Sequence, residues 1–297
     1  MTGFDLPAMD GVQHHFIELP GLRMHVAEAG AGETVLLLHG FPQHWWEWRE
    51  VIPELAGHYR VICPDLRGFG WTGAPPTGYT SDQFVSDVVA LLDVLDVDRV
   101  HVIGHDWGSL VAFQLCLSKP ERVRTHLCLS VPPPYISFDP ALVKVMWRLW
   151  FDFVLPVPLL GPWALRRTSL ARFLLTNSAT GGRSGWMPED VELFAGQFRD
   201  PARAHAGSAL YRSFILPTSM RMMRGTPDTR LTTRTRVLLG ADDPIVRAEF
   251  IHGHEPHVDD LTIEHVADAG HFLVDDQPKA VVEHALDLFR HPPASPA

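Results

Sequence analysis

The strongest constraint on the fold is the segment Gly104-His105-Asp106-Trp107-Gly108, which follows the short apolar run Val100–Ile103. That run predicts a buried strand, and Trp107–Leu117 has the pattern of a helix that begins directly after it. The two outer glycines allow the close backbone approach that a strained strand-to-helix turn requires. The spacing is that of a nucleophile elbow, with Asp106 at the position of the exposed nucleophile. A glycine-bounded turn with Asp106 as a helix N-cap is the alternative.

A carboxylate at the nucleophile position favours a particular chemistry. Serine attacks acyl carbon, whereas aspartate is better suited to an sp³ carbon, where it displaces a halide or opens a strained ring. The product is an alkyl ester that water must hydrolyse, so a histidine is needed as base in the second step. The sequence therefore predicts a two-step hydrolysis in which Asp106 needs no base for its own attack.

The rest of the chain predicts strands that alternate with amphipathic helices. The helices are expected at Ser81–Asp96, with Ser81 as N-cap, and at Gln277–Arg290. Short runs rich in valine, isoleucine and leucine are expected to be strands: Thr34–Leu38, Arg60–Cys63, Thr125–Val131, Arg236–Leu239 and Thr262–Val266. This alternation is typical of an α/β fold with a mostly parallel sheet flanked by helices.

The segment from Pro132 to about Thr226 differs in composition and periodicity from the chain on either side. It is rich in Trp, Pro, Met and Arg, with helical periodicity and no strand-like run. We therefore expect residues 1–132 and 227–297 to form one α/β core, and residues 133–226 to form a helical cap. Because open α/β sheets bind ligands at the C-terminal ends of their strands, the cap is a candidate lid.

The composition indicates which kinds of partner and which cellular compartment to expect. The net charge of −10 argues against a nucleic-acid backbone as the main partner. The N-terminal residues lack a signal-peptide pattern, and no apolar run is long enough to span a membrane, so we expect a cytoplasmic protein. A sparse, odd set of cysteines inside apolar segments predicts buried thiols in a reducing compartment: Cys63, Cys116 and Cys128.

The base and its acid are expected late in the chain. His271, in Asp268-Ala269-Gly270-His271-Phe272, follows the last predicted strand and precedes the last helix. The acid should follow an earlier strand, and Arg236–Leu239 leads into two adjacent aspartates. Asp243 is favoured over Asp242, because it lies three residues after the strand-end Gly240. The chain order nucleophile, acid, histidine is that of one known class of hydrolase.

Two backbone N–H groups are expected to stabilise the negative charge that develops during ester hydrolysis. One is the N–H of Trp107, directly after the nucleophile. The other is the N–H of Phe41, in the loop His39-Gly40-Phe41-Pro42 that follows Thr34–Leu38. Loss of such a donor typically lowers the rate by about 10²–10³-fold.

Five motifs together resemble the α/β-hydrolase superfamily and, within it, the epoxide hydrolases: HGFPQHWWEWREV, DLRGFGWTGAP, GHDWGS, GADDP and AGHF. Haloalkane dehalogenases are near relatives. The resemblance spans roughly residues 14–132 and 227–291. It implies Asp106 as nucleophile, His271 as base, Asp243 as its orienting acid, a helical cap and no cofactor. No metal site is expected. The residues that we expect in the substrate pocket are His39, Pro42, Trp150, Phe151 and Phe272.

The cap distinguishes epoxide hydrolases from related families. Epoxide hydrolases usually carry two cap tyrosines whose hydroxyls donate hydrogen bonds to the epoxide oxygen. Ala209-Leu210-Tyr211-Arg212 resembles the segment that holds one of them, so Tyr211 is the expected donor. The other should follow Trp150, where this chain has Phe151. Either Tyr211 acts alone, or Tyr135 or a cap histidine substitutes, or the substrate is not an epoxide.

The sequence thus predicts a cofactor-independent hydrolase that opens small apolar epoxides to vicinal diols. A carbon–halogen hydrolase is the first alternative. It is weaker because Phe41 stands where dehalogenases often have asparagine, and because Trp107 replaces the arginine of fluoroacetate dehalogenase elbows. The second alternative is a low-turnover binder of small apolar ligands. The sequence leaves open whether the protein forms a homodimer.

Overall fold

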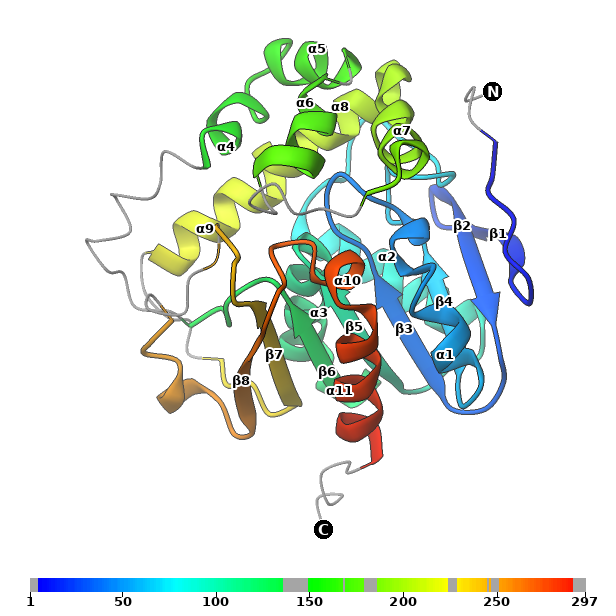
Figure 1. The fold of residues 1–297 in the computed structure, drawn as a ribbon, viewed down its shortest axis with the longest axis vertical. Helices are drawn as coiled ribbons and strands as arrows, with labels where there is room; N and C mark the ends of the chain where they lie inside the picture. The colour runs from blue at the N-terminus through cyan, green and yellow to red at the C-terminus, as the bar shows by residue number, and fades with distance from the viewer. Residues whose placement is uncertain are drawn as a thin grey trace.

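The computed structural model describes residues 5–135, 149–167, 169–178, 186–223, 229–244, 246 and 251–290. Its centre is an eight-stranded sheet with the order β1-β2-β4-β3-β5-β6-β7-β8 (Figure 1). The strands are β1 (Gln13–Leu19), β2 (Leu22–Ala29), β3 (Thr34–Leu38), β4 (Arg60–Pro64), β5 (Val100–His105), β6 (Val123–Leu129), β7 (Arg234–Gly240) and β8 (Leu261–Val266). Strands β3 to β8 pair in parallel, which confirms the predicted α/β sheet.

The N-terminal hairpin of β1 and β2 was not predicted. These strands pair antiparallel with each other, and β2 pairs antiparallel with β4. At the edge of the sheet, β1 is mostly exposed or half-buried, so its sequence QHHFIEL mixes polar and apolar residues instead of forming an apolar run. An edge strand with one solvated face gives a weak hydrophobic signal.

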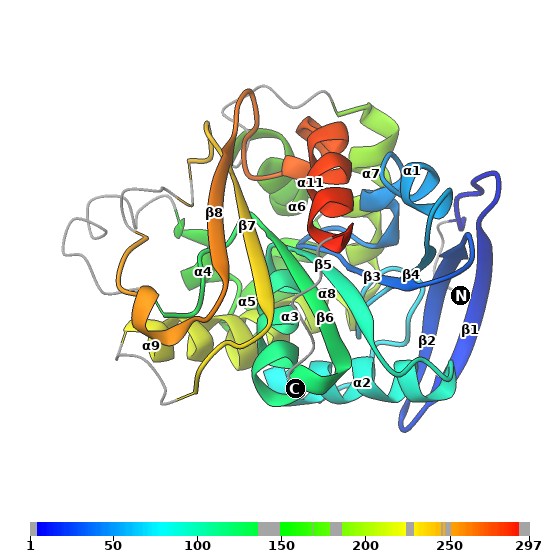
Figure 2. The same ribbon diagram turned by 90° about the horizontal axis from the view of Figure 1, so that it is seen from below.

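Helices cover both faces of the sheet (Figure 2). Helices α1 (Ile52–Ala56) and α11 (Pro278–Arg290) lie on one face, and α2 (Ser81–Val94) and α3 (Trp107–Ser118) lie on the other. Alternate side chains of β3 enter separate cores: Val35 and Leu37 pack in the core that includes α1 and α11, and Leu36 and Leu38 in the core that includes α2 and α3. Because both faces are covered, all five residues of β3 are buried, which explains its continuous apolar sequence.

The start of α2 differs from the prediction by one residue. The N-cap is Thr80, whose hydroxyl accepts a hydrogen bond from the N–H of Gln83, and Ser81 is the first helical residue. Thr and Ser can both cap a helix, so the adjacent pair Thr80-Ser81 does not fix the boundary from sequence.

The segment between β6 and β7 is helical, as predicted, and gathers at one end of the sheet (Figure 1). Its helices are α4 (Phe151–Val154), α5 (Leu160–Arg166), α6 (Ser169–Phe173), α7 (Pro188–Gly196), α8 (Pro201–Leu210) and α9 (Leu216–Met223). We call this segment the cap. Its expected end at residue 226 lies outside the described residues.

Two further expectations concern the cysteines and the membrane. All three cysteines are buried and free, as predicted. Within the described ranges, no helix has the length and apolar character that a membrane crossing would need.

Candidate active site

Asp106 lies on a strained turn between β5 and α3. Its φ of 49° and ψ of −125° are unusual for a residue other than glycine and cost about 1–3 kcal/mol. A Cβ on Gly104 would lie 2.6 Å from the Cα of Ser109, and one on Gly108 would lie 2.3 Å from the carbonyl oxygen of Leu38. Only glycine fits at these two positions. The side chain of Asp106 makes no capping hydrogen bond to α3, so its carboxylate does not serve to cap this helix.

His271 lies between two carboxylates. Its Nε2 is 3.7 Å from Oδ1 of Asp106, and its Nδ1 is 3.0 Å from Oδ2 of Asp243. The other carboxylate oxygen of Asp243 accepts a hydrogen bond from the N–H of Val246 at 3.1 Å. Asp242 is exposed, and its N–H donates to the carbonyl of Ala269. The structure therefore brings together Asp106, His271 and Asp243 from three separate segments.

The charges of this cluster are set by the contacts between its members. Burial would lower the pKa of His271, but the carboxylates of Asp243 and Asp106 raise it to about 10. Burial would raise the pKa of Asp106, but His271, His105 and the N–H of Phe41 together lower it. At neutral pH, Asp106 is consequently an ionised carboxylate beside a protonated His271.

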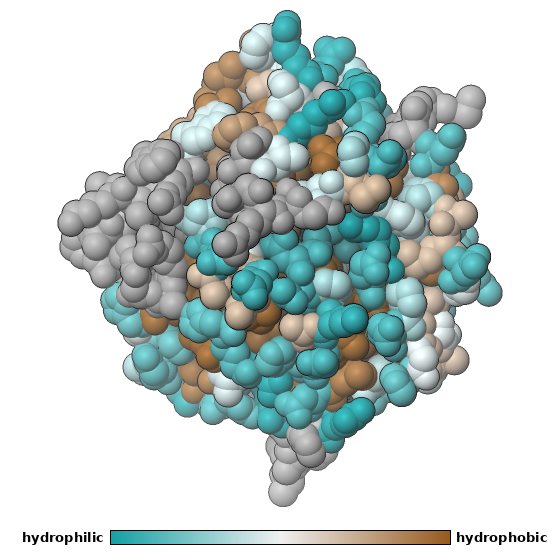
Figure 3. Space-filling view, in the orientation of Figure 1, coloured by the Kyte–Doolittle hydropathy of each residue, from teal (hydrophilic) through white to brown (hydrophobic). Residues whose placement is uncertain are grey.

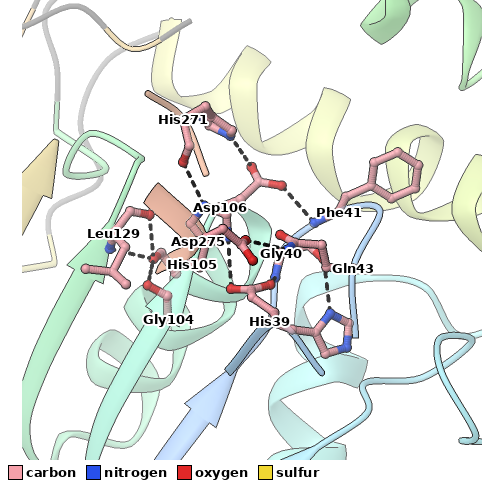
Figure 4. A network of polar contacts seen from close by, with 12 residues as sticks. His39, Gly40, Phe41, Gln43, Gly104, His105, Asp106, Leu129, His271 and Asp275 are labelled. Carbon is pink, nitrogen blue, oxygen red and sulfur yellow. Dashed lines mark hydrogen bonds and ion pairs between the residues drawn. The ribbon is translucent and has the colours of Figure 1, made fainter. Parts of the chain in front are cut away.

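One of the two predicted backbone donors contacts the Asp106 carboxylate. The N–H of Phe41 donates to its Oδ2 at 3.0 Å (Figure 4). Trp107 is the first residue of α3, so its N–H has no acceptor within the helix. The loop after β3 thus places the N–H of Phe41 beside Asp106, and the role of the Trp107 N–H stays a prediction.

A buried network behind the nucleophile joins three loops. Glu47 accepts a hydrogen bond from the N–H of Gly40 at 2.8 Å, and its other oxygen lies 3.0 Å from Nδ1 of His105. Nε2 of His105 donates to the carbonyl of His271 at 2.8 Å. Burial alone would lower the pKa of His105, but Glu47 raises it above its ordinary value. Sequence reasoning missed this pair, although a lone glutamate among tryptophans in WWEW is a signal for it.

A cavity of about 100 Å³ opens directly above Asp106. Its walls are mostly apolar, with a few ionisable groups, as in typical small-molecule sites. The core supplies Phe41, Asp106, Trp107, Leu110, His271 and Phe272, and the segment between β6 and β7 supplies Leu149, Phe151, Asp152, Leu174, Leu210, Tyr211 and Ile215.

Comparisons with known proteins agree with this geometry. The model of the alpha/beta hydrolase fold family matches residues 33–278. Epoxide hydrolase 2 of Siraitia grosvenorii is 31% identical over 95% of this chain and 99% of its own length. The soluble epoxide hydrolase of a Corynebacterium species is 30% identical over 94% of this chain and 97% of its own. The chain belongs to the epoxide hydrolase branch of the α/β hydrolases.

The crystal structure of epoxide hydrolase VrEH1 from Vigna radiata matches this α/β hydrolase with a TM-score of 0.77. The two are 28% identical, and the match covers 95% of this chain and 99% of the other. The likeness therefore includes the cap as well as the sheet.

The α/β hydrolase differs from the sequence prediction at three pocket positions, since His39, Pro42 and Trp150 lie outside the cavity lining. His39 is fully buried below the cavity, where its Nε2 accepts from the N–H of Leu66 at 3.0 Å. The carbonyl of Pro42 accepts a hydrogen bond from the Gln197 side chain. Trp150 is 40% exposed on the outside of the cap. Pro42 and Trp150 are adjacent in sequence to lining residues, and His39 lies two residues before one, but the side chain or carbonyl of each has another partner or faces solvent.

Neither expected substitute for the second cap tyrosine lines the cavity. The hydroxyl of Tyr135 donates to the carbonyl of Thr229 at 2.8 Å, and its ring stacks on His257. The histidine of segment 133–226 is His205, and it lies on the outside of the cap, 3.1 Å from the carbonyl oxygen of Pro76. The polar side chain that does line the cavity beside Phe151 is Asp152, which sequence reasoning missed.

A larger hollow of about 960 Å³ lies on the outer side of the cap. It is lined by arginines and apolar residues, among them Leu159, Trp163 and Arg212, and contains none of the predicted catalytic residues. Figure 3 shows some hydrophobic residues, in brown, on the cap at the top of the molecule, and Leu159 is 86% exposed. The cavity above Asp106 is therefore the candidate active site.

Proposed function

We propose that the chain hydrolyses epoxides to vicinal diols through a covalent ester on Asp106. The observation that supports this best is the ionised Asp106 carboxylate on a strained turn, facing an apolar cavity with His271 and Tyr211 in its walls. The names of its full-length relatives support the same substrate class.

In the first step, a carboxylate oxygen of Asp106 attacks an epoxide carbon and the ring C–O bond breaks. The electron pair of that bond goes to the epoxide oxygen, where negative charge develops. Tyr211 lines the cavity, and its hydroxyl has no hydrogen-bond partner among the described residues. Burial raises the pKa of Tyr211 well above its ordinary value, so the hydroxyl stays protonated and can donate to this oxygen.

Once the ester has formed, the His271 cation releases its proton, which balances the proton taken up by the epoxide oxygen. In the second step, the neutral His271 takes a proton from water, and the resulting hydroxide attacks the carbonyl carbon of the ester. Asp243 orients His271 and stabilises its positive charge through the 3.0 Å contact with Nδ1. The N–H groups of Phe41 and Trp107 stabilise the oxyanion of the tetrahedral intermediate. Its collapse breaks the ester bond, releases the diol and restores the Asp106 carboxylate.

The size and lining of the cavity favour a small apolar epoxide. A volume of about 100 Å³ is below the roughly 300–1,000 Å³ that is usual for drug-sized ligands. Substrates with a larger substituent would need the cap to move away from the core.

The decisive experiment separates the two steps. His271→Ala leaves the attack possible but removes the base for ester hydrolysis, so incubation with styrene oxide should yield protein heavier by one epoxide molecule. Intact-protein mass spectrometry followed by peptide mapping should place the added mass on Asp106, and Asp106→Ala should show none.

Four outcomes would contradict the proposal. Undiminished turnover by Asp106→Ala, or an adduct on Ser109, would exclude Asp106 as the nucleophile. An adduct formed with a 1-haloalkane, without oxygen, and none with epoxides would indicate a carbon–halogen hydrolase. Binding of epoxide with no adduct or turnover in the wild-type protein would indicate a ligand-binding protein.

A further inference from the structure

The cavity wall contains a second acid, Asp152, at the N-terminal end of α4 in the cap. It is partly buried, and no hydrogen-bond or ion-pair partner for it lies among the described residues. A carboxylate placed in a largely apolar cavity without a partner is unfavourable as an anion. Asp152 therefore differs from Asp106, which has His271 and the N–H of Phe41 beside it.

The charges that face Asp152 also disfavour its ionisation. The titratable groups that act on it from the elements around the cavity are Asp106 at the start of α3, His271 in the loop before α10 (Leu273–Asp276), and Tyr211 after α8. The negative charge of Asp106 opposes a second carboxylate, and the positive charge of His271 offsets this in part. Tyr211 carries no charge near neutral pH, because burial raises its pKa.

A neutral carboxylic acid is a hydrogen-bond donor as well as an acceptor. Among the described lining residues, Tyr211 carries the one hydroxyl, and Asp152 carries the one carboxyl besides that of Asp106. The two side chains both come from the cap, whereas the nucleophile comes from the core. An epoxide held between them would have Asp106 on one side of the ring and two O–H donors on the other.

We propose that Asp152, in its protonated form, is a catalytic acid that donates a proton to the epoxide oxygen as the ring opens, together with the hydroxyl of Tyr211. This inference rests on the proposed epoxide hydrolysis. It assigns the role of the second cap donor, whose expected position is occupied by Phe151 in this chain, to the next residue.

The protons balance over the whole cycle. In the first step, the Asp106 oxygen–carbon bond forms, the ring C–O bond breaks, and the oxygen takes the carboxyl proton of Asp152, which becomes a carboxylate. After the ester has formed, the His271 cation returns its proton to Asp152 and becomes neutral. In the second step, water loses one proton to His271, and the hydroxide displaces the diol from the ester. Asp106 is again a carboxylate, His271 a cation and Asp152 a neutral acid, so the net reaction is epoxide plus water to diol.

The titration behaviour of Asp152 is consistent with this role. Burial, and to a smaller extent the Asp106 carboxylate, raise its pKa from 3.8 to about 7. A catalytic acid works best when its pKa is near the working pH. The rate of ester formation should therefore fall as the pH rises above about 7, while the Asp106 nucleophile stays ionised throughout.

The test is the rate of ester formation, measured by quenched-flow mass spectrometry with styrene oxide over pH 5.5–9. Asp152→Leu should form the ester about 10–100-fold more slowly at pH 6.5. This is a small effect for the loss of a general acid, because the Tyr211 hydroxyl remains as a donor. Asp152→Asn keeps the shape and an N–H donor but cannot transfer a proton, so its slower rate should not change over this pH range. Phe151→Tyr in the Asp152→Leu background should restore part of the rate, which a packing defect would not allow.

The matched control is Glu192→Gln, a carboxyl-to-amide change on the exposed side of α7, where Glu192 pairs with Arg172 and Arg199. It should leave the rate and its pH dependence unchanged. If Asp152→Asn forms the ester as fast as the wild type with the same decline above pH 7, the role of Asp152 is overturned, while ester formation on Asp106 still stands. If the wild type forms no ester, the proposed function itself fails.

Discussion

The side-chain amide of Gln197, in the cap, donates a hydrogen bond to the carbonyl of Pro42, in the core, at 2.8 Å. The oxygen of the same amide accepts from the N–H of Gly70 at 2.9 Å, and the Gln197 side chain is fully buried. Pro42 directly follows Phe41, whose N–H donates to Asp106. One cap side chain therefore satisfies backbone groups of two core loops and supports the loop whose N–H contacts Asp106.

Replacing Gln197 by Leu should weaken both stability and catalysis. The change leaves the carbonyl of Pro42 and the N–H of Gly70 buried without this partner, which should lower the free energy of unfolding by about 2–4 kcal/mol. Movement of the Phe41 loop should lower kcat about 10-fold. Urea unfolding and steady-state kinetics measure the two effects. Gln13→Leu, at an exposed position of β1, is the control, and equal losses in both variants would contradict the prediction.

Tyr211→Phe should slow ester formation more than ester hydrolysis. In the proposed mechanism the hydroxyl donates to the epoxide oxygen in the first step and has no role in the attack of water, so a loss of about 10–100-fold is expected in the first rate constant alone. Single-turnover kinetics with an epoxide separate the two constants. An unchanged rate of ester formation would remove Tyr211 from this role.

Glu47→Gln tests the buried network behind the nucleophile. An amide keeps an acceptor for the N–H of Gly40 but removes the charge that pairs with His105. The loss of one partner of a buried ion pair should lower the free energy of unfolding by about 3 kcal/mol. Because His105 holds the carbonyl of His271, kcat should fall while KM changes little. Glu50→Gln, at an exposed position, should change neither quantity.

Asp152 should make stability depend on pH. Its pKa in the folded protein, about 7, lies above its ordinary value of 3.8, so the folded state binds the proton more tightly than the unfolded state. Its contribution to stability is complete below pH 3.8 and is lost as the pH rises through 7. Asp152→Asn should therefore raise Tm at pH 8, by an amount that corresponds to about 1–3 kcal/mol, and should not raise it at pH 4. Equal Tm values at pH 8 would contradict this.

The sheet and the elbow could be predicted because their physical causes act locally. A parallel strand covered on both faces needs a continuous apolar run, as in Thr34–Leu38, which the structure confirms without a shift. The glycines around Asp106 are needed because backbone atoms approach within 3 Å of where a Cβ would be. Strand β1 of the N-terminal hairpin escaped prediction because its exposed face allows polar residues.

Other parts of the site depend on contacts between distant segments. Gln197 meets Pro42 across 155 residues, and no local pattern in either segment indicates that contact. His39 illustrates a different limit, because its neighbour Phe41 reaches the cavity while the His39 ring turns inward to Phe69 and Trp107. Which way a loop side chain turns is decided by the packing of the whole core. Asp152 was missed for the same reason.

The position of His271 between two carboxylates has a consequence for the order of events. Its pKa of about 10 depends on negative charge at both Asp243 and Asp106. Once Asp106 becomes an ester, one of these charges disappears, and the affinity of His271 for its proton falls. In the resting protein the imidazole is thus held as a cation that cannot act as a base. In the proposed mechanism, formation of the covalent intermediate releases this proton, so water is activated only after Asp106 has been consumed.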